Sequence, residues 1–355
     1  MAVSNTVGDV LRANGVSRRG FMKFCAATAS MMALPPSMVS AVAAAIETAK
    51  RPSVFWLPFQ ECTGCTEALT RSHSPTVENL IFDALSLDYH HTLMAASGDR
   101  AEEAMYKEME ANYGNYLLLV DGSIPTGDYE AYSCTNGHTH LSMLLHAAKG
   151  AAAIVSIGTC AAYGGIPKAN PNPTQAVGVQ DLIKDKPIIN VPGCPPVPTV
   201  MTGVLAHYLT FGTIPELDEF GRPMAFFGQN IHDRCYRRTF YDRGLFAETF
   251  DDEGAKKGYC LFKLGCKGPV TYNACATLKW NDGVSWPVQS GHGCLGCSEP
   301  DFWDKGSFYR PLSAAYWGDA KTVGASAAAG AAAGLAAAAL ARGKQKKAQQ
   351  QEEQA

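Results

Sequence analysis

The 355-residue sequence predicts a parallel, doubly wound α/β sheet domain followed by a second, loop-rich domain. Two observations predict this fold class. Up to residue 211, short apolar runs alternate with helix-like stretches, the pattern of a parallel sheet with crossover helices. Beyond residue 211, Gly, Cys, aromatic and turn residues replace the periodic runs. So long a loop-rich stretch is unusual in a globular protein unless metal centres replace the missing core.

Five apolar runs are the candidate strands of the first domain. They lie at Ser53–Leu57, Asp88–Met94, Tyr116–Val120, Ala152–Ile157 and Ile188–Val191. Helix-like segments lie between them, with Met and Tyr spaced among charges in Arg100–Tyr113 and an apolar stripe in Thr139–Lys149. We therefore expect the first domain to span residues 51–211 and the loop-rich domain to span residues 212–320.

The composition narrows the classes of function that this protein can have. A hydrophobic fraction of 46% and a charged fraction of 18% are those of a globular protein with a core. The net charge of -3, without a basic stripe alternating with aromatics, gives no reason to expect nucleic acid as a partner. Twelve cysteines are many for this length, and they need a use in disulfides, metal sites or both.

Residues 1–45 have the features of an export signal. The segment Ser17-Arg18-Arg19-Gly20-Phe21-Met22-Lys23 matches the twin-arginine pattern. A weakly apolar stretch follows, and then small-residue sites such as Ala41-Val42-Ala43, where a peptidase can cut. The alternative is a basic amphipathic helix with two adjacent arginines by chance. Because the twin-arginine route carries folded proteins, often with cofactors inserted, we expect a periplasmic protein that holds a cofactor.

Residues 321–355 form an Ala-rich segment with a basic end. The nineteen residues Val323–Ala341 carry no charge, and Arg342, Lys344, Lys346 and Lys347 follow them. This length just spans a hydrocarbon core of about 30 Å, and the basic end satisfies the positive-inside rule. Alanine is barely apolar, however, so two interpretations stay open: an anchor in the cytoplasmic membrane, or a solvated Ala-rich tail.

Four cysteines follow strands of the predicted sheet. Cys62 and Cys65 come directly after the first strand, Cys160 follows the fourth and Cys194 follows the fifth. The carboxyl ends of parallel strands meet at one edge, where open α/β sheets bind their ligands. Four thiolates gathered there from three loops make a candidate iron–sulfur cluster site.

The loop-rich domain contains two further groups of candidate ligands. The first group, one imidazole and three thiolates, comprises His232, Cys235, Cys260 and Cys266. The second group, three thiolates, comprises Cys275, Cys294 and Cys297. Three thiolates suit a 3Fe cluster, which lacks one corner of the cube.

Disulfides and structural zinc are the alternatives for these cysteines. An exported chain rich in cysteine is ordinarily disulfide-bonded, but the twin-arginine route exports prefolded cargo. Zinc sites usually gather their ligands locally, whereas the first four cysteines span about 130 positions.

The remaining cysteines and histidines receive simpler interpretations. Cys25 lies in the export signal, and Cys134 stands alone and is expected to be a buried, unreactive thiol. His292, two residues before Cys294, is a candidate for lining the second group or contacting a partner. The histidines interpreted as structural are His90, His91 and His207.

The sequence resembles the small subunits of nickel–iron hydrogenases from Arg18 to the basic tail. The motifs that carry the resemblance are Glu61-Cys62-Thr63-Gly64-Cys65, Gly158-Thr159-Cys160-Ala161, Gly193-Cys194-Pro195-Pro196, His232-Asp233-Arg234-Cys235, Gly265-Cys266-Lys267-Gly268-Pro269 and Gly291-His292-Gly293-Cys294-Leu295-Gly296-Cys297-Ser298-Glu299. Their order and combination are far more specific than any one of them. The resemblance implies a flavodoxin-like first domain that binds no flavin.

The resemblance also implies which cluster each group holds. A proximal 4Fe–4S cluster would bind Cys62, Cys65, Cys160 and Cys194. A medial 3Fe–4S cluster would bind Cys275, Cys294 and Cys297. A distal 4Fe–4S cluster would bind His232, Cys235, Cys260 and Cys266.

The implied function is an electron relay. The nickel–iron centre would lie on a separate large subunit, so this chain alone would have no hydrogenase activity. Electrons from hydrogen would pass from the proximal to the medial to the distal cluster, and then to an external acceptor such as a cytochrome. Glu61 and Thr63 are candidates for helping protons leave at the subunit interface.

One departure from the family pattern is informative. Oxygen-tolerant, membrane-bound members carry two extra cysteines around the proximal cluster, and the corresponding residues here are Gly64 and Gly165. The sequence therefore predicts an ordinary cubane and the oxygen-sensitive type.

Two other functions remain open at this point. A cluster-bearing subunit of another oxidoreductase, such as the related quinone-reductase assemblies, would share only the first domain. An exported, disulfide-bonded binding protein would hold no iron.

Overall fold

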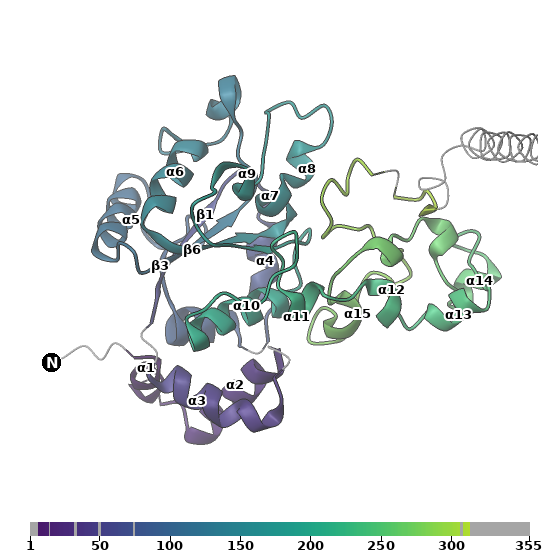
Figure 1. Cartoon of the computed structure of the whole chain (residues 1–355), viewed down its shortest axis with the longest axis horizontal. Helices are drawn as coiled ribbons and strands as arrows, with labels where there is room; N and C mark the ends of the chain where they lie inside the picture. The colour runs from purple at the N-terminus through teal and green to yellow at the C-terminus, as the bar shows by residue number, and fades with distance from the viewer. Residues whose placement is uncertain are drawn as a thin grey trace, which may run out of the picture.

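The first domain is built on a five-stranded parallel sheet (Figure 1). The computed structural model describes residues 6–13, 15–31, 34–48, 51–73, 75–305 and 308–312, and the Ala-rich segment 321–355, with the anchor expected there, lies outside them. The strands of the sheet are β1 (Ser53–Pro58), β2 (Ser86–Tyr89), β3 (Tyr116–Asp121), β6 (Ala151–Ile157) and β7 (Ile188–Val191). Among the helices of the described ranges, none is both long and apolar enough to cross a bilayer.

The strand order is β2-β1-β3-β6-β7. Counted among themselves, these strands follow the order 2-1-3-4-5 of flavodoxin-like folds, which confirms the predicted fold class. The register aligns their carboxyl ends, because Pro58 pairs with Asp121, Asp121 with Ile157, and Ile157 with Val191. The loops that follow β1, β3, β6 and β7 therefore leave from one edge.

Helices cover both faces of the sheet, so its strands are apolar on both sides. On one face lie α4 (Gly64–Thr70), η2 (Asn79–Ala84) and α10 (Pro198–Phe211), and on the other lie α5 (Asp99–Ala111), α6 (His140–Gly150) and α9 (Val179–Leu182). Along β3, Leu117 packs toward Val204 of α10, whereas Leu118 packs toward Met105 and Leu144.

The observed elements differ from the expected ones mainly at their ends. The expected strand Asp88–Met94 is too long, because β2 ends at Tyr89 and the chain turns at His90, whose carbonyl accepts from the Met94 N–H at 3.0 Å. The remaining short elements of this domain are η3 (Gly127–Tyr132), β4 (Cys134–Thr135), β5 (His138–Thr139), α7 (Gly158–Tyr163) and α8 (Gly165–Lys168).

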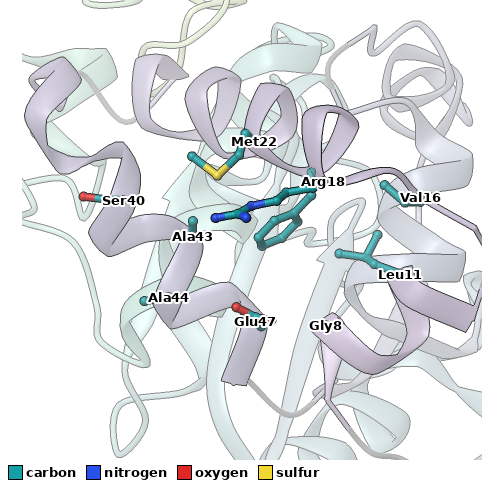
Figure 2. Close-up of a pocket in the computed structure, with 10 residues that line it drawn as sticks. Gly8, Leu11, Val16, Arg18, Met22, Ser40, Ala43, Ala44 and Glu47 are labelled. Carbon is teal, nitrogen blue, oxygen red and sulfur yellow. The ribbon is translucent and has the colours of Figure 1, made fainter.

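The amino-terminal segment folds as helices that lie beneath α10 in Figure 1. Its elements are α1 (Val7–Ala13), α2 (Arg18–Met31), η1 (Pro36–Met38) and α3 (Val39–Thr48). Cys25 and Val42 are fully buried between these helices. A pocket of about 590 Å³ lies there. Figure 2 shows Arg18 of α2 extending across it toward α3.

The second domain consists of short helices joined by loops, as its composition predicts. They are α11 (Met224–Phe227), α12 (Ile231–Arg234), α13 (Arg238–Asp242), α14 (Glu253–Lys256), η4 (Phe262–Leu264), η5 (Gly268–Val270) and α15 (Cys275–Leu278). Its small core contains Leu261, Trp286 and Val288 together with Cys266 and Cys294. Two candidate ligands are thus part of the core itself.

Candidate metal centres

The four cysteines of the first group converge at the carboxyl edge of the sheet. Cys62 and Cys65 lie at the start of α4, Cys160 lies in α7 after β6, and Cys194 follows β7. After burial, neighbouring thiols contribute to raising their pKa values: Cys62 acts on Cys160, and both act on Cys194. Cys65 is affected in the same way by Cys160 and Cys194. We name these residues the proximal set.

Two glycines leave space for the side chains of the proximal set. A Cβ atom on Gly158 would lie 2.5 Å from the Sγ of Cys65, and Gly158 also has a φ of +84°. A Cβ on Gly165, whose φ is +55°, would lie 2.7 Å from the Sγ of Cys160. Both positions therefore favour glycine for space as well as for backbone conformation.

A buried carboxylate lies beside the proximal set, and the sequence analysis did not predict it. Asp121, the last residue of β3, is 1% exposed, and its side chain contacts Cys65. Burial, and then the charge of Glu61, raise the pKa of Asp121 to about 7. Burial likewise raises the pKa of Glu61, whose Oε1 accepts from the Thr63 hydroxyl at 3.3 Å. The position of Asp121 at the end of a buried strand is the only feature of the sequence that points to it.

The three cysteines of the medial set also lie together. Cys275 begins α15, while Cys294 and Cys297 lie in the loop beyond Trp286. The Cys297 thiolate contributes to the raised pKa of both Cys275 and Cys294, after burial as the main cause. The backbone N–H of Gly296 donates to the Sγ of Cys294 at 3.4 Å.

The distal set combines one imidazole with three thiols. Cys235 and Cys260 each lie close enough to Cys266 for its charge to contribute to their raised pKa values, after burial. His232 is on α12, and a Cβ atom on Gly268 would lie 3.5 Å from the Cys266 Sγ and 3.8 Å from the His232 Cβ. Burial lowers the pKa of His232, which favours the neutral imidazole that binds metal.

Contacts connect each set to the next. The backbone amide of Cys194, in the proximal set, lies close enough to the sulfur of Cys297, in the medial set, to lower the pKa of that thiol. The backbone N–H of Cys294, in the medial set, donates to the Sγ of Cys266 in the distal set at 3.3 Å. The three sets therefore form a continuous row in the order proximal, medial, distal.

The chemistry of the three sets fits iron–sulfur clusters. Burial raises the pKa of Cys160 and of Cys194 to about 12 and that of Cys260 to about 11. Such thiols stay neutral at physiological pH unless positive charge accompanies them, and the iron of a cluster supplies that charge. All twelve cysteines are free thiols in the structure. Within the described ranges, no three His, Cys, Asp or Glu side chains are arranged to hold a single metal ion.

Arg222 ties the medial loop to residues 218–222, which follow the sheet domain, and sequence reasoning gave no sign of it. Its guanidinium is almost fully buried and pairs with Asp218 at 2.7 Å and with Glu299 at 2.9 Å. The rings of Phe220, Phe227 and Tyr272 surround it at 5.0–5.7 Å. Because Glu299 lies two residues after Cys297, Arg222 holds the medial loop against its own segment, whose Gly221 carbonyl accepts from the Asn190 N–H of β7 at 2.8 Å.

Of the remaining singled-out residues, Cys134 was placed wrongly. It is exposed on the short β4–β5 hairpin, where its Sγ donates to the carbonyl of Ala131 at 3.3 Å. Cys25 is buried in α2. His90 is buried and hydrogen-bonds Thr66 at 3.1 Å, as a structural histidine does.

The other two histidines thought to be structural, His91 and His207, are less buried than His90. Burial lowers the pKa of each of them. His292 lies at the surface between the rings of Phe250 and Tyr309, at 6.0 and 5.7 Å.

Family models match both domains. The model for the C-terminal part of the NiFe/NiFeSe hydrogenase small subunit matches residues 227–310. The model described as "NADH ubiquinone oxidoreductase, 20 Kd subunit" matches residues 62–208, within the first domain alone.

Whole-chain relatives agree with the first of these models. The uptake hydrogenase small subunit of Afipia carboxidovorans is 51% identical over 312 residues, which cover 88% of this chain and 85% of that protein. The hydrogenase-1 small chain of Escherichia coli is 48% identical over 304 residues, covering 86% and 82%. Among solved structures, the Ni-Fe-Se hydrogenase of Desulfomicrobium baculatum matches with a TM-score of 0.68 and 40% identity, covering 74% of this chain and 100% of that chain.

The fold and the three cysteine sets define an iron–sulfur electron-transfer subunit of a redox enzyme. The chain belongs to the small subunits of nickel–iron hydrogenases. It is thus part of a hydrogenase, its cysteines serve iron–sulfur cluster binding, and its partner is a hydrogenase large subunit. The alternative of a disulfide-bonded binding protein is excluded by this membership.

Proposed function

We propose that this chain carries electrons from hydrogen, oxidised on the large subunit, through three clusters to an external acceptor such as a cytochrome. When bound, the clusters supply centres that accept and release one electron at a time. The proximal set, Cys62, Cys65, Cys160 and Cys194, would hold a 4Fe–4S cluster. The distal set, His232, Cys235, Cys260 and Cys266, would hold a second one, and the medial set, Cys275, Cys294 and Cys297, a 3Fe–4S cluster.

The observation that carries this proposal is the row of contacts between sets. At the first junction the backbone amide of Cys194 lies close enough to Cys297 to lower its thiol pKa, and at the second the backbone N–H of Cys294 donates to the Sγ of Cys266 at 3.3 Å. Three isolated sites would not need such contacts, whereas a relay needs neighbouring centres in a fixed order.

The exposed fraction of the ligands supports a partner at the proximal end. Cys62 is exposed, whereas Cys65, Cys160 and Cys194 are partly buried. If the large subunit packs over Cys62, it excludes water from this end of the row. Glu61 and Thr63 lie at the same edge, and the raised pKa of Glu61 suits a carboxyl group that passes protons there.

The proximal site supports the oxygen-sensitive type. A Cβ on Gly64 would lie 3.1 Å from the Sγ of Cys62, and one on Gly165 would lie 2.7 Å from the Sγ of Cys160. We propose that a cubane with four cysteine ligands occupies this site, because these positions carry no further thiols.

We also propose that the protein is exported and works as a heterodimer in the periplasm, attached to the cytoplasmic membrane. The twin-arginine pattern of residues 1–45 supports export, and the uncharged segment with basic end in residues 321–355 supports attachment. Relatives such as those of Afipia carboxidovorans and Azotobacter vinelandii are named uptake hydrogenase small subunits, which favours hydrogen oxidation as the working direction.

Iron and acid-labile sulfide analysis of the anaerobically purified heterodimer tests the cluster proposal. We expect about eleven iron atoms per small subunit, four each from two cubanes and three from the medial cluster. Electron paramagnetic resonance of the oxidised protein should show a 3Fe signal, and Cys275→Ala should lose that signal while Cys134→Ala keeps it. Iron near zero, or no 3Fe signal in the unmodified protein, would refute the proposal.

A further inference from the structure

Thr159 connects the loops that carry ligands of two different sets. It is 1% exposed and stands next to Cys160 in α7. Its hydroxyl accepts from the backbone N–H of Gly193 at 2.9 Å and donates to the carbonyl of Cys297. Its own N–H donates to the carbonyl of Gly193 at 3.0 Å. One side chain therefore touches the loop of Cys194 and the medial ligand Cys297 at once.

These contacts hold Cys297 at both ends of the residue. The Thr159 hydroxyl donates to its carbonyl, and the backbone amide of Cys194 lies close enough to its sulfur to lower the pKa of the thiol. The hydroxyl also fixes the Pro192–Gly193 peptide through the Gly193 N–H, while the carbonyl of the Gly193–Cys194 peptide accepts from the Thr159 backbone N–H. A serine in place of Thr159 can make both hydroxyl bonds, whereas a valine of the same shape can make neither.

We propose that Thr159 is the positioning residue of the proximal-to-medial junction, where its hydroxyl keeps Cys194 and Cys297 in contact for electron transfer. This inference rests on the proposed function. In the step concerned, one electron leaves the reduced proximal centre and reduces the oxidised medial centre by one electron. No bond forms or breaks, and the hydroxyl keeps its proton. Hydrogen oxidised on the large subunit supplies the electron, and a one-electron dye in excess finally takes it.

The second junction serves as an internal control. There, the N–H of Cys294 donates to the Sγ of Cys266 at 3.3 Å, and the N–H of Lys267 donates to the carbonyl of Cys294 at 2.8 Å. Both are backbone N–H groups, and Thr159 makes neither bond. A change at Thr159 should therefore slow the first transfer and leave the second unchanged.

The test compares Thr159→Val and Thr159→Ala with Thr159→Ser in the holo heterodimer. Thr202→Val is the matched control, because Thr202 is a buried threonine whose hydroxyl bonds the carbonyl of Pro198 in its own helix. Freeze-quench electron paramagnetic resonance after mixing with hydrogen gives the rate at which the 3Fe signal disappears. Iron content and the midpoint potential of the medial centre are measured on the same samples.

We expect the valine and alanine variants to keep their iron and their medial potential but to slow medial reduction on the order of tenfold, the usual scale for losing a group that orients ligands. The serine and Thr202→Val variants should match the unmodified protein. The inference is overturned if valine and alanine transfer at the normal rate, if the medial potential shift accounts for the slowing, or if neither variant assembles while Thr159→Ser and Thr202→Val do. Absence of cluster signals in the unmodified protein would instead refute the proposed function.

Discussion

The proximal set and the other two sets are held in place by different kinds of structure. The proximal ligands leave from β1, β6 and β7, whose ends are aligned by strand pairing and backed by cores on both faces. The medial and distal ligands sit on two four-residue helices, α12 and α15, and on loops, and Cys266 and Cys294 are themselves core residues. The comparison indicates that the first site is prefolded, whereas the second domain depends on its metal.

The charges around the sets differ as well. Asp121 and Glu61 lie at the proximal set. Arg237, whose backbone N–H donates to the Cys235 sulfur at 3.4 Å, and the buried Lys267 lie at the other two sets, where their positive charges act on Cys266. Negative charge makes a cluster harder to reduce, and positive charge makes it easier. This arrangement favours electron flow away from the proximal end.

Loss of one ligand from each region should give the largest effects. It tests most directly whether the proximal site is prefolded while the second domain depends on its metal. We expect Cys65→Ala to abolish hydrogen-dependent dye reduction and to lose about four iron atoms, while its sheet stays folded. Cys260→Ala should lose activity and also the protease resistance of residues 227–310, because this part lacks a large core of its own. Cys134→Ala is the control. Equal protease resistance in the two ligand variants would contradict the distinction.

Removing the Arg222 side chain tests how the regions are joined. Arg222→Met leaves the half-buried carboxylates of Asp218 and Glu299 without their partner, which should cost about 3 kcal/mol of unfolding free energy. Denaturant unfolding should then separate into two transitions, one for each domain. Lys256→Met, whose partner Glu253 is exposed, should change little. A single unshifted transition for Arg222→Met would show that Arg222 does not couple the domains.

Acidification should weaken the sheet domain through its buried histidines. Burial lowers the pKa of His90 to about 4, below its unfolded value of 6.5. Between pH 6.5 and pH 4 the unfolded chain therefore binds more protons than the folded chain. The stability that neutral, buried His90 contributes above pH 6.5 is lost as the pH falls from there through 4. The loss is up to roughly 3 kcal/mol.

Hydrogen exchange of residues 53–58 measures this loss, since Trp56 packs on His90 at 5.0 Å. His90→Gln should flatten the pH dependence, whereas the exposed His73→Gln should keep it. An unchanged slope in His90→Gln would assign the acid sensitivity to other groups.

The smallest expected effect sharpens the contrast in charge. At pH 8, above the pKa of about 7, Asp121 is ionised, and Asp121→Asn removes a negative charge beside Cys65. We expect the proximal potential to rise on the order of 60 mV, about 1.4 kcal/mol for one electron. Redox titration followed by electron paramagnetic resonance measures it, with the exposed Asp128→Asn as control. A medial potential that moves as much as the proximal one would contradict a local effect.

Much of the fold could be predicted because both faces of the sheet are covered. Apolar runs such as Ile188–Val191 therefore mark their strands directly, and the predicted and observed bounds of β7 agree. The grouping of cysteines relied on ligand type and order, which are visible in a sequence. The cluster assignment itself remains a prediction.

Other features depend on contacts that local sequence does not encode. Asp121 reaches Cys65 only because β1 and β3 pair in one register. Arg222 is informative only once Asp218 and Glu299 surround it. Cys134 was misplaced because lone cysteines are usually buried, whereas this one lies on a two-residue strand of a surface hairpin.

If the amino-terminal segment is cleaved as proposed, its helical packing has a consequence for the timing of that cleavage. Val42 and Ala43, at the expected cleavage site, are 0% and 7% exposed within α3. Proteases cut accessible, extended chain, so α3 has to unwind and leave α10 before a peptidase can act there. Once it leaves, Ala206 and Leu209 of α10, which line a small apolar pocket with Ile46, lose their cover. Precursor and mature protein would then present different surfaces to the proteins that handle them.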